Sequence, residues 1–379
     1  MSKLRLDIVV GGRFHSDHLA SALLAAGHDV KLYTSLPRLR FPTLPDGVVR
    51  SFVFPELVAI AAARLGLNER GEAAKMELFG RACERHIRRD ADAIYAWSGF
   101  ALESFRRFRG TKILIRDSTH IDHQYEVLKR EYEARGIRHA LNPLAPRRER
   151  EEYELADRIV LLSHIAERTF LERGVTPEKL KILSLGADTS VFSPGTPRPA
   201  NLPLRVVFFG FICVRKGVLY LLEAARALPP GLVKLTLVGP VEKSLRSRVR
   251  SSGVVHLPSM SHRDLAAYLR TQDVFVLPSL EDGFAMTIPQ AMAAGLVPVV
   301  SDQCGASELV QPEKNGLILP SRDASKIAQA LERLARDPGL VARLREGLEE
   351  GRSSRDWSAY HHEVQASVPA LREALRKTP

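Results

Sequence analysis

The sequence predicts an α/β protein of two domains, each built around a parallel β-sheet covered by helices. Short apolar runs alternate with helical patterns along the whole chain, and this alternation is typical of strand-helix units. The chain has 379 residues, which is too long for one ordinary core and suits two domains of roughly 200 residues or fewer. A proline-rich stretch at 193–203, SPGTPRPANLP, interrupts the periodicity and predicts an interdomain linker.

The individual elements follow from these patterns. The predicted strands are 6–10, 93–97, 112–116 and 158–163 before the linker, and 205–209, 233–239, 273–279 and 297–301 after it. The predicted helices are 18–27, 101–108, 165–174, 218–228 and 289–295. We therefore expect a first domain over 1–195, a second over 204–355, and a C-terminal helix over 356–379 that packs back on the first domain. Open α/β domains bind ligands at the carboxyl ends of their strands, so the cleft between the domains is the expected site.

The composition is that of an ordinary globular protein, with 45% hydrophobic and 26% charged residues. The three cysteines, Cys83, Cys213 and Cys304, lie far apart, so neither a disulfide framework nor a cysteine metal site is predicted. No run of about 18 apolar residues occurs, and no signal sequence precedes the first strand. We expect a cytoplasmic protein.

The net charge of +11 is concentrated near the N-terminus, where residues 1–150 hold 26 Lys and Arg against 18 Asp and Glu. The densest clusters are Arg81, Arg85, Arg88 and Arg89, then Arg106, Arg107 and Arg109, then Arg147, Arg148 and Arg150. Two interpretations stay open: a solvated helix face, or a surface for anionic lipid head groups or an acidic acceptor. Peripheral contact with the inner face of a membrane is thus one hypothesis. Nucleic acid is not an expected partner, because no basic-aromatic reader motif accompanies the charge.

The most informative segment is 278–310, PSLEDGFAMTIPQAMAAGLVPVVSDQCGASELV. A strand ends at Ser279, a turn holds Asp282 and Gly283, and a helix begins near Pro289, which suits a first helical turn. The start of a helix presents free backbone N–H groups to an anion. Asp282 and Gln290 stand eight residues apart, a spacing that lets the carboxylate meet a sugar while the amide meets a more distant hydroxyl.

This segment resembles glycosyltransferase family 4, whose motif is a Glu-x7-Glu pair within PSxxEGFGxxxxEAMAxGxPVV. The resemblance implies the GT-B fold, with two Rossmann-like, doubly wound domains facing a central cleft. It also implies a retaining transferase that uses a nucleoside-diphosphate sugar and needs no metal or organic cofactor. By this resemblance Asp282 binds the donor sugar and Gln290 the ribose, although Asp and Gln replace both glutamates. The backbone between them is expected to contact the donor, with the diphosphate on the amides of Met286 and Thr287. The residues of that stretch are Gly283, Phe284, Ala285, Met286 and Thr287.

A second segment, FFGFICVRKGVLYLLEA, resembles the family's GRxxxRKG element, whose Arg and Lys neutralise the diphosphate. Lys216 matches, and Gly210 matches the glycine of the strand-to-loop turn. Phe211 stands where the family has Arg, so Arg215 is the candidate for the second cation. We expect Asp282 and Lys216 to carry the chemistry, with the leaving diphosphate stabilised by the cation.

Weaker resemblances cover the first domain. Gly11 and Gly12 follow the first strand, where the absence of a Cβ lets backbone approach donor or acceptor. His120 follows the strand 112–116, where the family uses a His that faces the donor sugar, so the resemblance makes His120 a third candidate catalytic residue. The segment 156–194 follows the family's end-of-domain pattern, which implies a packing role for Gly186 and Asp188.

Two further motifs are not assigned a function. Asp90 and Asp92 form a DxD sequence ahead of a strand in the first domain, away from the expected donor site, and we assign them no metal. Ser163 and His164 lack the GxSxG context of a hydrolase triad.

The resulting hypothesis is a hexosyltransferase-like enzyme of polysaccharide, glycolipid or glycoside biosynthesis. The expected donor is UDP- or GDP-linked, and the acceptor is unknown, with a lipid-linked acceptor as one option. Two alternatives stay open: a sugar-nucleotide epimerase of the same fold, and a catalytically impaired nucleotide-sugar-binding protein. An acceptor-dependent product separates the transferase from both.

Overall fold

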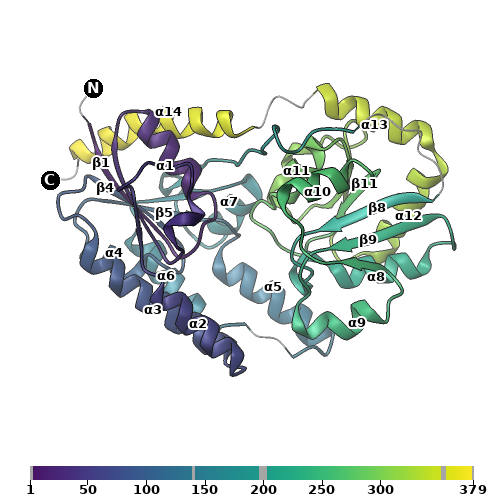
Figure 1. Ribbon diagram of the computed structural model, residues 1–379, viewed down its shortest axis with the longest axis horizontal. Helices are drawn as coiled ribbons and strands as arrows, with labels where there is room; N and C mark the ends of the chain where they lie inside the picture. Colours follow the sequence, from purple (N-terminus) through teal and green to yellow (C-terminus); the bar gives the residue numbers. More distant parts are fainter. Residues whose placement is uncertain (1–2, 139–140, 196–202, 351–355, 378–379) are drawn as a thin grey trace.

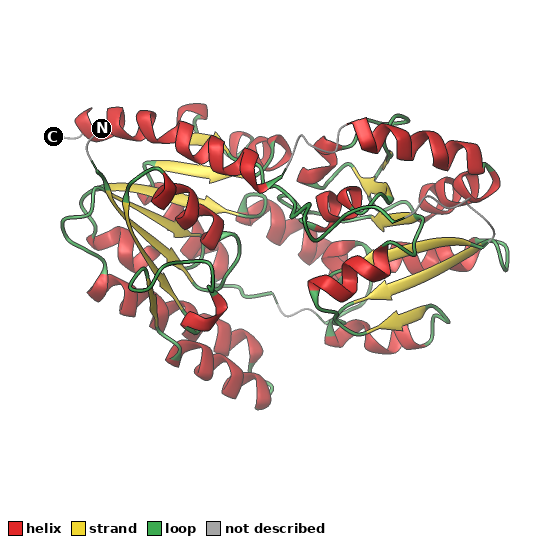
Figure 2. Cartoon of the chain, turned by 45° about the horizontal axis from the view of Figure 1, so that its top comes forward, coloured by secondary structure: helices red, strands yellow, loops and turns green. Residues whose placement is uncertain are grey.

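The computed structural model describes residues 3–138, 141–195, 203–350 and 356–377. The chain forms two α/β halves side by side, with the N-terminal half on the left and the C-terminal half on the right of Figure 1. Figure 2 shows strands inside and helices outside in both halves. The proline-rich linker predicted at 193–203 lies largely outside the described residues.

The N-terminal domain holds a seven-stranded parallel sheet. Its strands are β1 Arg5–Val10, β2 Asp29–Thr34, β3 Val49–Ser51, β4 Ala93–Trp97, β5 Thr111–Arg116, β6 Arg158–Leu161 and β7 Leu180–Ile182. The spatial order is β3-β2-β1-β4-β5-β6-β7, so the chain reverses its direction of travel between β1 and β4. Residues Leu6 to Val10 are buried, as expected for a parallel strand covered on both faces.

Helices cover this sheet. They are α1 Ser16–Ala25, η1 Arg38–Arg40, α2 Phe54–Arg64, α3 Asn68–His86, α4 Leu102–Arg107, α5 Ile121–Ala134, α6 Ala145–Leu155, α7 His164–Leu171 and η2 Pro177–Lys179. In α3 the apolar residues recur at helical spacing, and Phe79 and Cys83 are fully buried in the core. The same helix leaves its arginines at the surface, as the sequence pattern predicts.

The C-terminal domain holds a six-stranded parallel sheet in the order β10-β9-β8-β11-β12-β13. Its strands are β8 Leu204–Phe209, β9 Val233–Val238, β10 Val255–Leu257, β11 Val274–Leu277, β12 Val297–Ser301 and β13 Leu317–Leu319. Its helices are η3 Val214–Lys216, α8 Val218–Ala227, η4 Lys243–Leu245, α9 Arg246–Arg250, α10 His262–Leu269, α11 Thr287–Ala293, η5 Gly305–Leu309, α12 Ala324–Arg336 and α13 Pro338–Glu350. The reversal falls between β8 and β11, and open sheets bind ligands at the carboxyl ends of strands at such a point.

The last helix, α14 Trp357–Lys377, crosses from the second domain back to the first, where it lies along α1 (Figure 1). The rings of Trp357 and His18 stack with centroids 3.6 Å apart, and Tyr360 is buried against His15. Within the described residues, no helix is both long and apolar enough to cross a bilayer.

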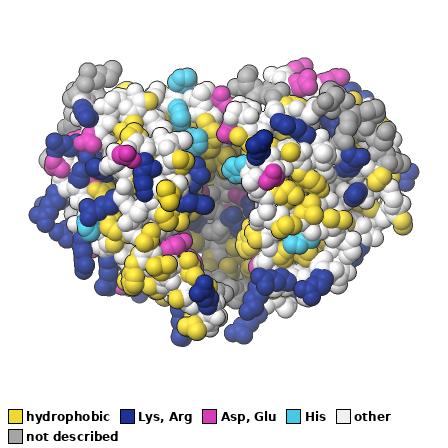
Figure 3. Space-filling view, viewed as in Figure 1, with side chains coloured by type: hydrophobic (Ala, Val, Ile, Leu, Met, Phe, Trp, Pro, Cys, Tyr) yellow, Lys and Arg dark blue, Asp and Glu magenta, His cyan; other side chains and the backbone are white. Residues whose placement is uncertain are grey.

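The two domains meet at the carboxyl ends of their sheets, and the space-filling view shows the surface hollowed between them (Figure 3). On one side of this furrow, the Ser163 hydroxyl donates to the backbone carbonyl of Gly283 at 2.7 Å. On another side, α5 reaches the second domain, where the Tyr132 hydroxyl donates to Glu242 at 3.0 Å. Buried Glu131 on α5 also forms an ion pair with Arg322 at 3.2 Å. The furrow is therefore bounded by direct contacts between the domains.

Candidate donor and acceptor site

Two loops of the C-terminal domain meet at the carboxyl ends of β8 and β11. One follows β8 and runs from Gly210 to Gly217, and the other follows β11 and runs from Pro278 to Gly283. Gly217 has a positive φ of 69°, and a Cβ there would lie 1.8 Å from the carbonyl oxygen of Pro278. Only glycine allows the two backbones to approach this closely without displacing one of the loops, so Gly217 permits the contact between them. These are the two segments singled out by the sequence motifs.

Lys216 and Asp282 meet between these loops as an ion pair. The Asp282 side chain is only 5% exposed, and its Oδ1 atom also accepts from the backbone N–H of Phe284 at 3.3 Å. Burial alone would raise the pKa of Asp282, but the nearby Lys216 and Arg215 cations outweigh it and lower the pKa below its ordinary value. Asp282 is thus an ionised carboxylate held next to a cation.

Glu281, the neighbour of Asp282, is a residue that the sequence motif does not single out. Its side chain is fully buried and accepts hydrogen bonds from the N-terminal domain. The donors are the Ser118 hydroxyl, the Thr119 backbone N–H at 3.1 Å, the Thr119 hydroxyl at 2.7 Å, and the Gln124 amide at 3.1 Å. Arg215 completes the set from the C-terminal domain, with a nitrogen 3.4 Å from Oε2 of Glu281.

The electrostatics of Glu281 follow from this ring of donors. Burial would raise its pKa, but the Arg215 guanidinium and the hydroxyl donors hold the pKa below its ordinary value. Arg215 lies between Glu281 and Asp282, 3.9 Å from the latter, and its own pKa is raised by these carboxylates despite burial. Arg215 is therefore committed to two carboxylates, whereas Lys216 has one.

The segment after Asp282 runs along the N-terminal domain before it enters α11. A Cβ on Gly283 would lie 2.4 Å from the carbonyl oxygen of Asp117, so the domains approach closely here. Ala285 adopts a positive φ of 58°, and Met286 precedes the first residue of α11, Thr287. Gln290 is partly exposed, and none of the described residues forms a hydrogen bond with its side chain. Its amide is available to a ligand.

Gly210 and Phe211 shape the other loop. Gly210 has a φ of 124°, and a Cβ on Gly239 would lie 2.1 Å from the carbonyl oxygen of Gly210. Phe211, which stands where the resembled family has Arg, is 51% exposed. An exposed phenylalanine supplies no charge, so the cations of this loop are Arg215 and Lys216.

The glycines after β1 are packed against aromatic rings of their own domain. A Cβ on Gly11 would overlap the Phe100 ring at 2.0 Å, and one on Gly12 would lie 3.0 Å from Phe14. The structure therefore gives Gly11 a packing reason for lacking a side chain. Phe14 is itself 56% exposed with a positive φ of 42°, so this loop presents an aromatic ring at the carboxyl end of β1.

His120 is placed beside the site but packed inward. Its ring contacts Tyr153 and Phe170, and its Nδ1 accepts from the backbone N–H of Asp122 at 3.2 Å, which caps α5. Burial lowers the pKa of His120 to about 3, so the ring is neutral. The hydrogen bond and ring contacts of His120 are thus made within the N-terminal domain, while its neighbours Ser118 and Thr119 reach Glu281 in the second domain.

A different histidine lies at the switch point of the N-terminal sheet. His15 follows β1, and its Nδ1 is 3.8 Å from an oxygen of Asp117, which follows β5. The buried Nε2 of His15 and Oδ1 of Asp117 have no hydrogen-bond partner within the described residues, and burial lowers the pKa of His15. Buried polar atoms without a partner are uncommon, so this pair is a candidate for contact with an acceptor.

The motifs left without a function have structural roles. Arg5 holds the DxD sequence: its side chain pairs with Asp90, and its backbone N–H donates to Asp92 at 2.7 Å. Ser163 caps α7 and touches Gly283, while His164 pairs with Glu167 at 3.0 Å. Across the described residues, no group of three His, Cys, Asp or Glu side chains is arranged to hold a metal ion.

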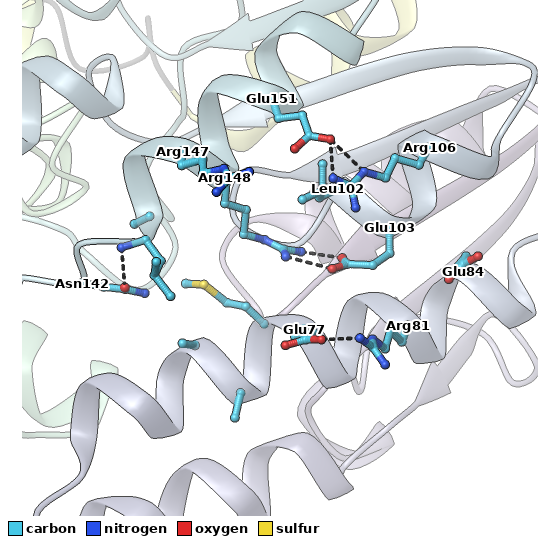
Figure 4. Close-up of a pocket in the computed structure, with 15 residues that line it drawn as sticks. Glu77, Arg81, Glu84, Leu102, Glu103, Arg106, Asn142, Arg147, Arg148 and Glu151 are labelled. Atoms are coloured by element: carbon cyan, nitrogen blue, oxygen red, sulfur yellow. Dashed lines mark hydrogen bonds and ion pairs between the residues drawn. The ribbon is translucent and has the colours of Figure 1, made fainter.

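A cavity of about 710 Å³ lies away from the furrow, between α3, α4 and α6 (Figure 4). It gathers arginines from all three basic clusters, but each labelled pair joins Arg to Glu. The pairs are Arg81 with Glu77, Arg106 with Glu151, and Arg148 with Glu103. These arginines are largely neutralised within the domain, so much of the N-terminal charge is not an open basic surface.

The contact between Glu281 and the N-terminal domain generates a stability prediction. Glu281→Ala should lower the free energy of unfolding by about 3–5 kcal/mol, because it leaves the partly buried Arg215 with Asp282 alone and removes several cross-domain hydrogen bonds. Urea denaturation measures the change. Glu308→Ala is the control: Glu308 is exposed and accepts one cross-domain hydrogen bond, from Ile165 at 2.8 Å, so it should cost about 1 kcal/mol or less.

The pH dependence has a definite sign. The pKa of Glu281 in the folded protein is below its ordinary value of 4.5. The ionised carboxylate therefore contributes fully to the free energy of unfolding above pH 4.5, and this contribution is lost as the pH falls through the lowered pKa of the folded state. The stability gap between wild type and Glu281→Gln should therefore narrow only in acid. A gap that is constant from pH 7 to pH 3, or equal losses in Glu281→Ala and Glu308→Ala, would contradict this account.

Two curated glycosyltransferases are similar to about half of this chain. The MMP α-(1→4)-mannosyltransferase of Mycolicibacterium hassiacum is 34% identical over 203 residues, which are 50% of this chain and 48% of the relative. The putative colanic acid biosynthesis glycosyltransferase WcaL of Escherichia coli is 30% identical over 210 residues, 51% of each chain. The chain thus spans about half the length of the curated relatives it matches.

Solved structures match over nearly the whole chain at low sequence identity. Sucrose-phosphate synthase from Thermosynechococcus elongatus superposes with a TM-score of 0.72 at 20% identity, covering 98% of this chain and all of the other. HepE from Anabaena, solved in complex with UDP, gives a TM-score of 0.67 at 17% identity, covering 97% and 100%. The chain therefore has the GT-B fold of such glycosyltransferases, and its residues 203–337 match the family described as glycosyl transferases group 1.

Proposed function

We propose that the protein transfers a sugar from a nucleoside-diphosphate sugar to an acceptor hydroxyl, with retention of anomeric configuration and without a metal ion. The observation that carries the proposal is the Lys216–Asp282 ion pair between two loops at the switch point of the C-terminal sheet. A cation and a carboxylate in that position suit a diphosphate and a sugar hydroxyl. The matched family segment, 203–337, contains both residues.

The ion pair suggests how the donor is accommodated. Without a ligand, Lys216 neutralises Asp282. A donor diphosphate would compete for the ammonium group and free the carboxylate to accept hydrogen bonds from sugar hydroxyls. Gln290 is placed on the next helix with an uncommitted amide, which suits a ribose hydroxyl. The backbone from Gly283 to Thr287 lies between them, and we assign the diphosphate to the amides of Met286 and Thr287.

The chemical step then needs few protein groups. The bond between the anomeric carbon and the diphosphate oxygen breaks, and a bond to the acceptor oxygen forms on the same face of the sugar. The acceptor proton passes to the departing phosphate. Lys216 contributes most here, because the phosphate oxygens gain negative charge as the bond breaks. Glycosidases instead need two carboxylates that flank the sugar, and Glu281 is occupied by cross-domain donors.

We assign UDP- or GDP-sugars as the donor class and polysaccharide or glycolipid synthesis as the process. HepE is described in complex with UDP-glucose, and WcaL is named for colanic acid biosynthesis, which supports this choice of classes. The acceptor would enter from the N-terminal side of the furrow, where Phe14 is exposed and His15 and Asp117 keep unpartnered atoms.

The test is a donor panel. The purified protein is incubated with UDP-, GDP- and ADP-sugars and candidate acceptors, with and without EDTA, and products are identified by mass spectrometry and NMR. We expect an acceptor-dependent product with the anomeric configuration of the donor, formed equally well in EDTA. Epimerised nucleotide sugar without acceptor, or binding without turnover, would favour the alternatives. Activity lost in EDTA and restored by Mg²⁺ would refute metal independence.

Lys216 and Gln290 should affect different kinetic constants. Lys216→Ala removes a charge-assisted contact that strengthens in the transition state, so kcat/KM should fall roughly 10- to 100-fold. Gln290→Ala removes a ribose contact made equally in the ground state, so it should mainly raise KM. Steady-state kinetics and nucleoside-diphosphate titration provide both readouts.

Comparing Arg215→Ala with Lys216→Ala tests which of the two cations binds the donor diphosphate. Because Arg215 is committed to Glu281 and Asp282, its removal should lower the thermal unfolding midpoint more than Lys216→Ala does, since Lys216→Ala leaves Asp282 with Arg215 as a partner. If Lys216→Ala binds the preferred nucleotide as wild type does, while a still-folded Arg215→Ala loses it, then Arg215 is the phosphate ligand instead. If neither change matters, this loop is not the phosphate site.

We also propose peripheral contact with a membrane through α2, which follows the edge strand β3 of the N-terminal domain. Three apolar residues on one side of this helix are exposed: Phe54 by 65%, Leu57 by 59% and Ile60 by 47%. Leu39, exposed between Arg38 and Arg40, lies in the neighbouring η1. Apolar side chains flanked by arginines suit the surface of an anionic bilayer, which would also present a lipid-linked acceptor.

Sedimentation with phosphatidylglycerol vesicles tests this contact. Leu57→Asp combined with Ile60→Asp should reduce vesicle binding by about tenfold or more, because two apolar contacts with lipid are replaced by charges that the bilayer repels. Ser325→Asp combined with Gln329→Asp, at two exposed positions of α12 in the C-terminal domain, is the control that adds the same charge elsewhere. Vesicle binding that is unaffected by the double change would refute a role for α2.

A further inference from the structure

Two arginine clusters that are separate in the sequence converge on one small cavity at the opposite end of the N-terminal sheet from the furrow. The cavity has a volume of about 340 Å³ and lies between the C-terminal ends of α3 and α4. It is lined by Glu84, Arg85, Ile87, Arg88, Arg89, Arg107, Phe108 and Arg109. Five guanidinium groups thus border one cavity with a single carboxylate. We call it the arginine pocket.

Three of these arginines have no acidic partner among the described residues. Arg88 is committed to Asp7 at 2.7 Å and Asp29 at 2.8 Å, and Arg107 lies 3.5 Å from Glu84. No ion pair involves Arg85, Arg89 or Arg109 within the part of the chain that the structure describes, and all three are exposed. Ile87 and Phe108, by contrast, are buried and contribute apolar surface to the lining.

The neighbouring cavity of Figure 4 shows what a structural arginine cluster looks like in this domain. There Arg81, Arg106 and Arg148 each bind a glutamate. The arginine pocket differs because three of its five arginines have no carboxylate partner among the described residues. Like charges brought together without a counter-ion repel, so such an arrangement favours a bound anion.

Helix ends account for only part of this arrangement. Arg85 and Arg107 stand in the last turns of α3 and α4, where a cation interacts favourably with the free backbone carbonyls. That explanation does not reach Arg89 and Arg109, which follow the helices and still line the cavity. The positions of Arg89 and Arg109, which come from separate loops, are therefore not explained by the helix ends.

We propose that the arginine pocket binds a phosphate or diphosphate group, at a site separate from the donor cleft. Guanidinium groups recognise phosphate oxygens through paired, charge-assisted hydrogen bonds, and several of them around one cavity suit a doubly charged anion. The pocket lies where β4 and β5 begin, whereas the furrow lies where they end, so one ligand cannot occupy both sites. The phosphate is supplied either by a soluble metabolite or by the head group of an anionic lipid.

Titration calorimetry with pyrophosphate at low ionic strength tests the soluble source, with the full chain in four forms. Wild type and the control Arg81→Ala/Arg106→Ala, whose arginines are paired with glutamates, should bind at the pocket. Arg89→Ala/Arg109→Ala should weaken this binding by about tenfold or more. Lys216→Ala should keep it, because Lys216 lies in the cleft, so failure of the proposed donor site is separable from failure of this one.

Sedimentation with phosphatidylglycerol vesicles tests the lipid source in the same variants. Loss of vesicle binding in Arg89→Ala/Arg109→Ala, with the control unaffected, would assign the phosphate to a lipid head group. Thermal melts of all variants check that these exposed substitutions leave the fold intact. The proposal is overturned if the control pair loses as much binding as the pocket pair, or if neither pyrophosphate nor vesicles distinguish them.

Discussion

The buried carboxylate of Glu281 is the contact on which the geometry of the furrow depends. It accepts hydrogen bonds from the N-terminal domain while Arg215 neutralises it from its own domain. Asp282, the next residue, pairs with Lys216. The residue that holds the domains together and the residue proposed to hold the sugar are thus adjacent, and any movement between the domains moves the donor site. A carboxylate suits this position because it accepts several hydrogen bonds at once, which a neutral amide does less well.

Much of this arrangement is predictable from local sequence patterns. The strand-helix alternation predicts two parallel sheets, and the motif at 278–310 predicts the turn at Asp282 and the helix after it. Strands such as β2, DVKLYT, escape the pattern, because polar residues interrupt their apolar run. Glu281 escapes it too, since its partners lie about 160 residues earlier and no local signal reports that contact. Gly11 and His120 show the reverse case, in which a residue type suggests contact with a ligand but the structure also gives the residue a packing role. Gly11 lies against the ring of Phe100. The ring of His120 packs against Tyr153 and Phe170.

The N-terminal charge shows how pairing decides what a basic sequence means. Counting residues gives only a net excess of positive charge over 1–150. The structure separates the arginines into those that bind glutamates, such as Arg148, and those that face a cavity without a carboxylate partner among the described residues, such as Arg89. Pairs of the first kind stabilise contacts between helices and contribute little to long-range attraction. Sequence alone cannot divide the two groups, because the partners of each arginine are set by how α3, α4 and α6 pack.

The return of α14 to the first domain brings two distant parts of the chain together. The second connection between the domains ends at Asp356, which forms a β-bridge with Ala187 close to where the first connection leaves the N-terminal domain. A Cβ on Gly186 would lie 2.1 Å from the carbonyl oxygen of Asp356, so the two backbones are in direct contact. Both covalent connections therefore attach to the N-terminal domain at one point, and the packing of α14 on α1 makes the end of the chain part of the first domain's surface.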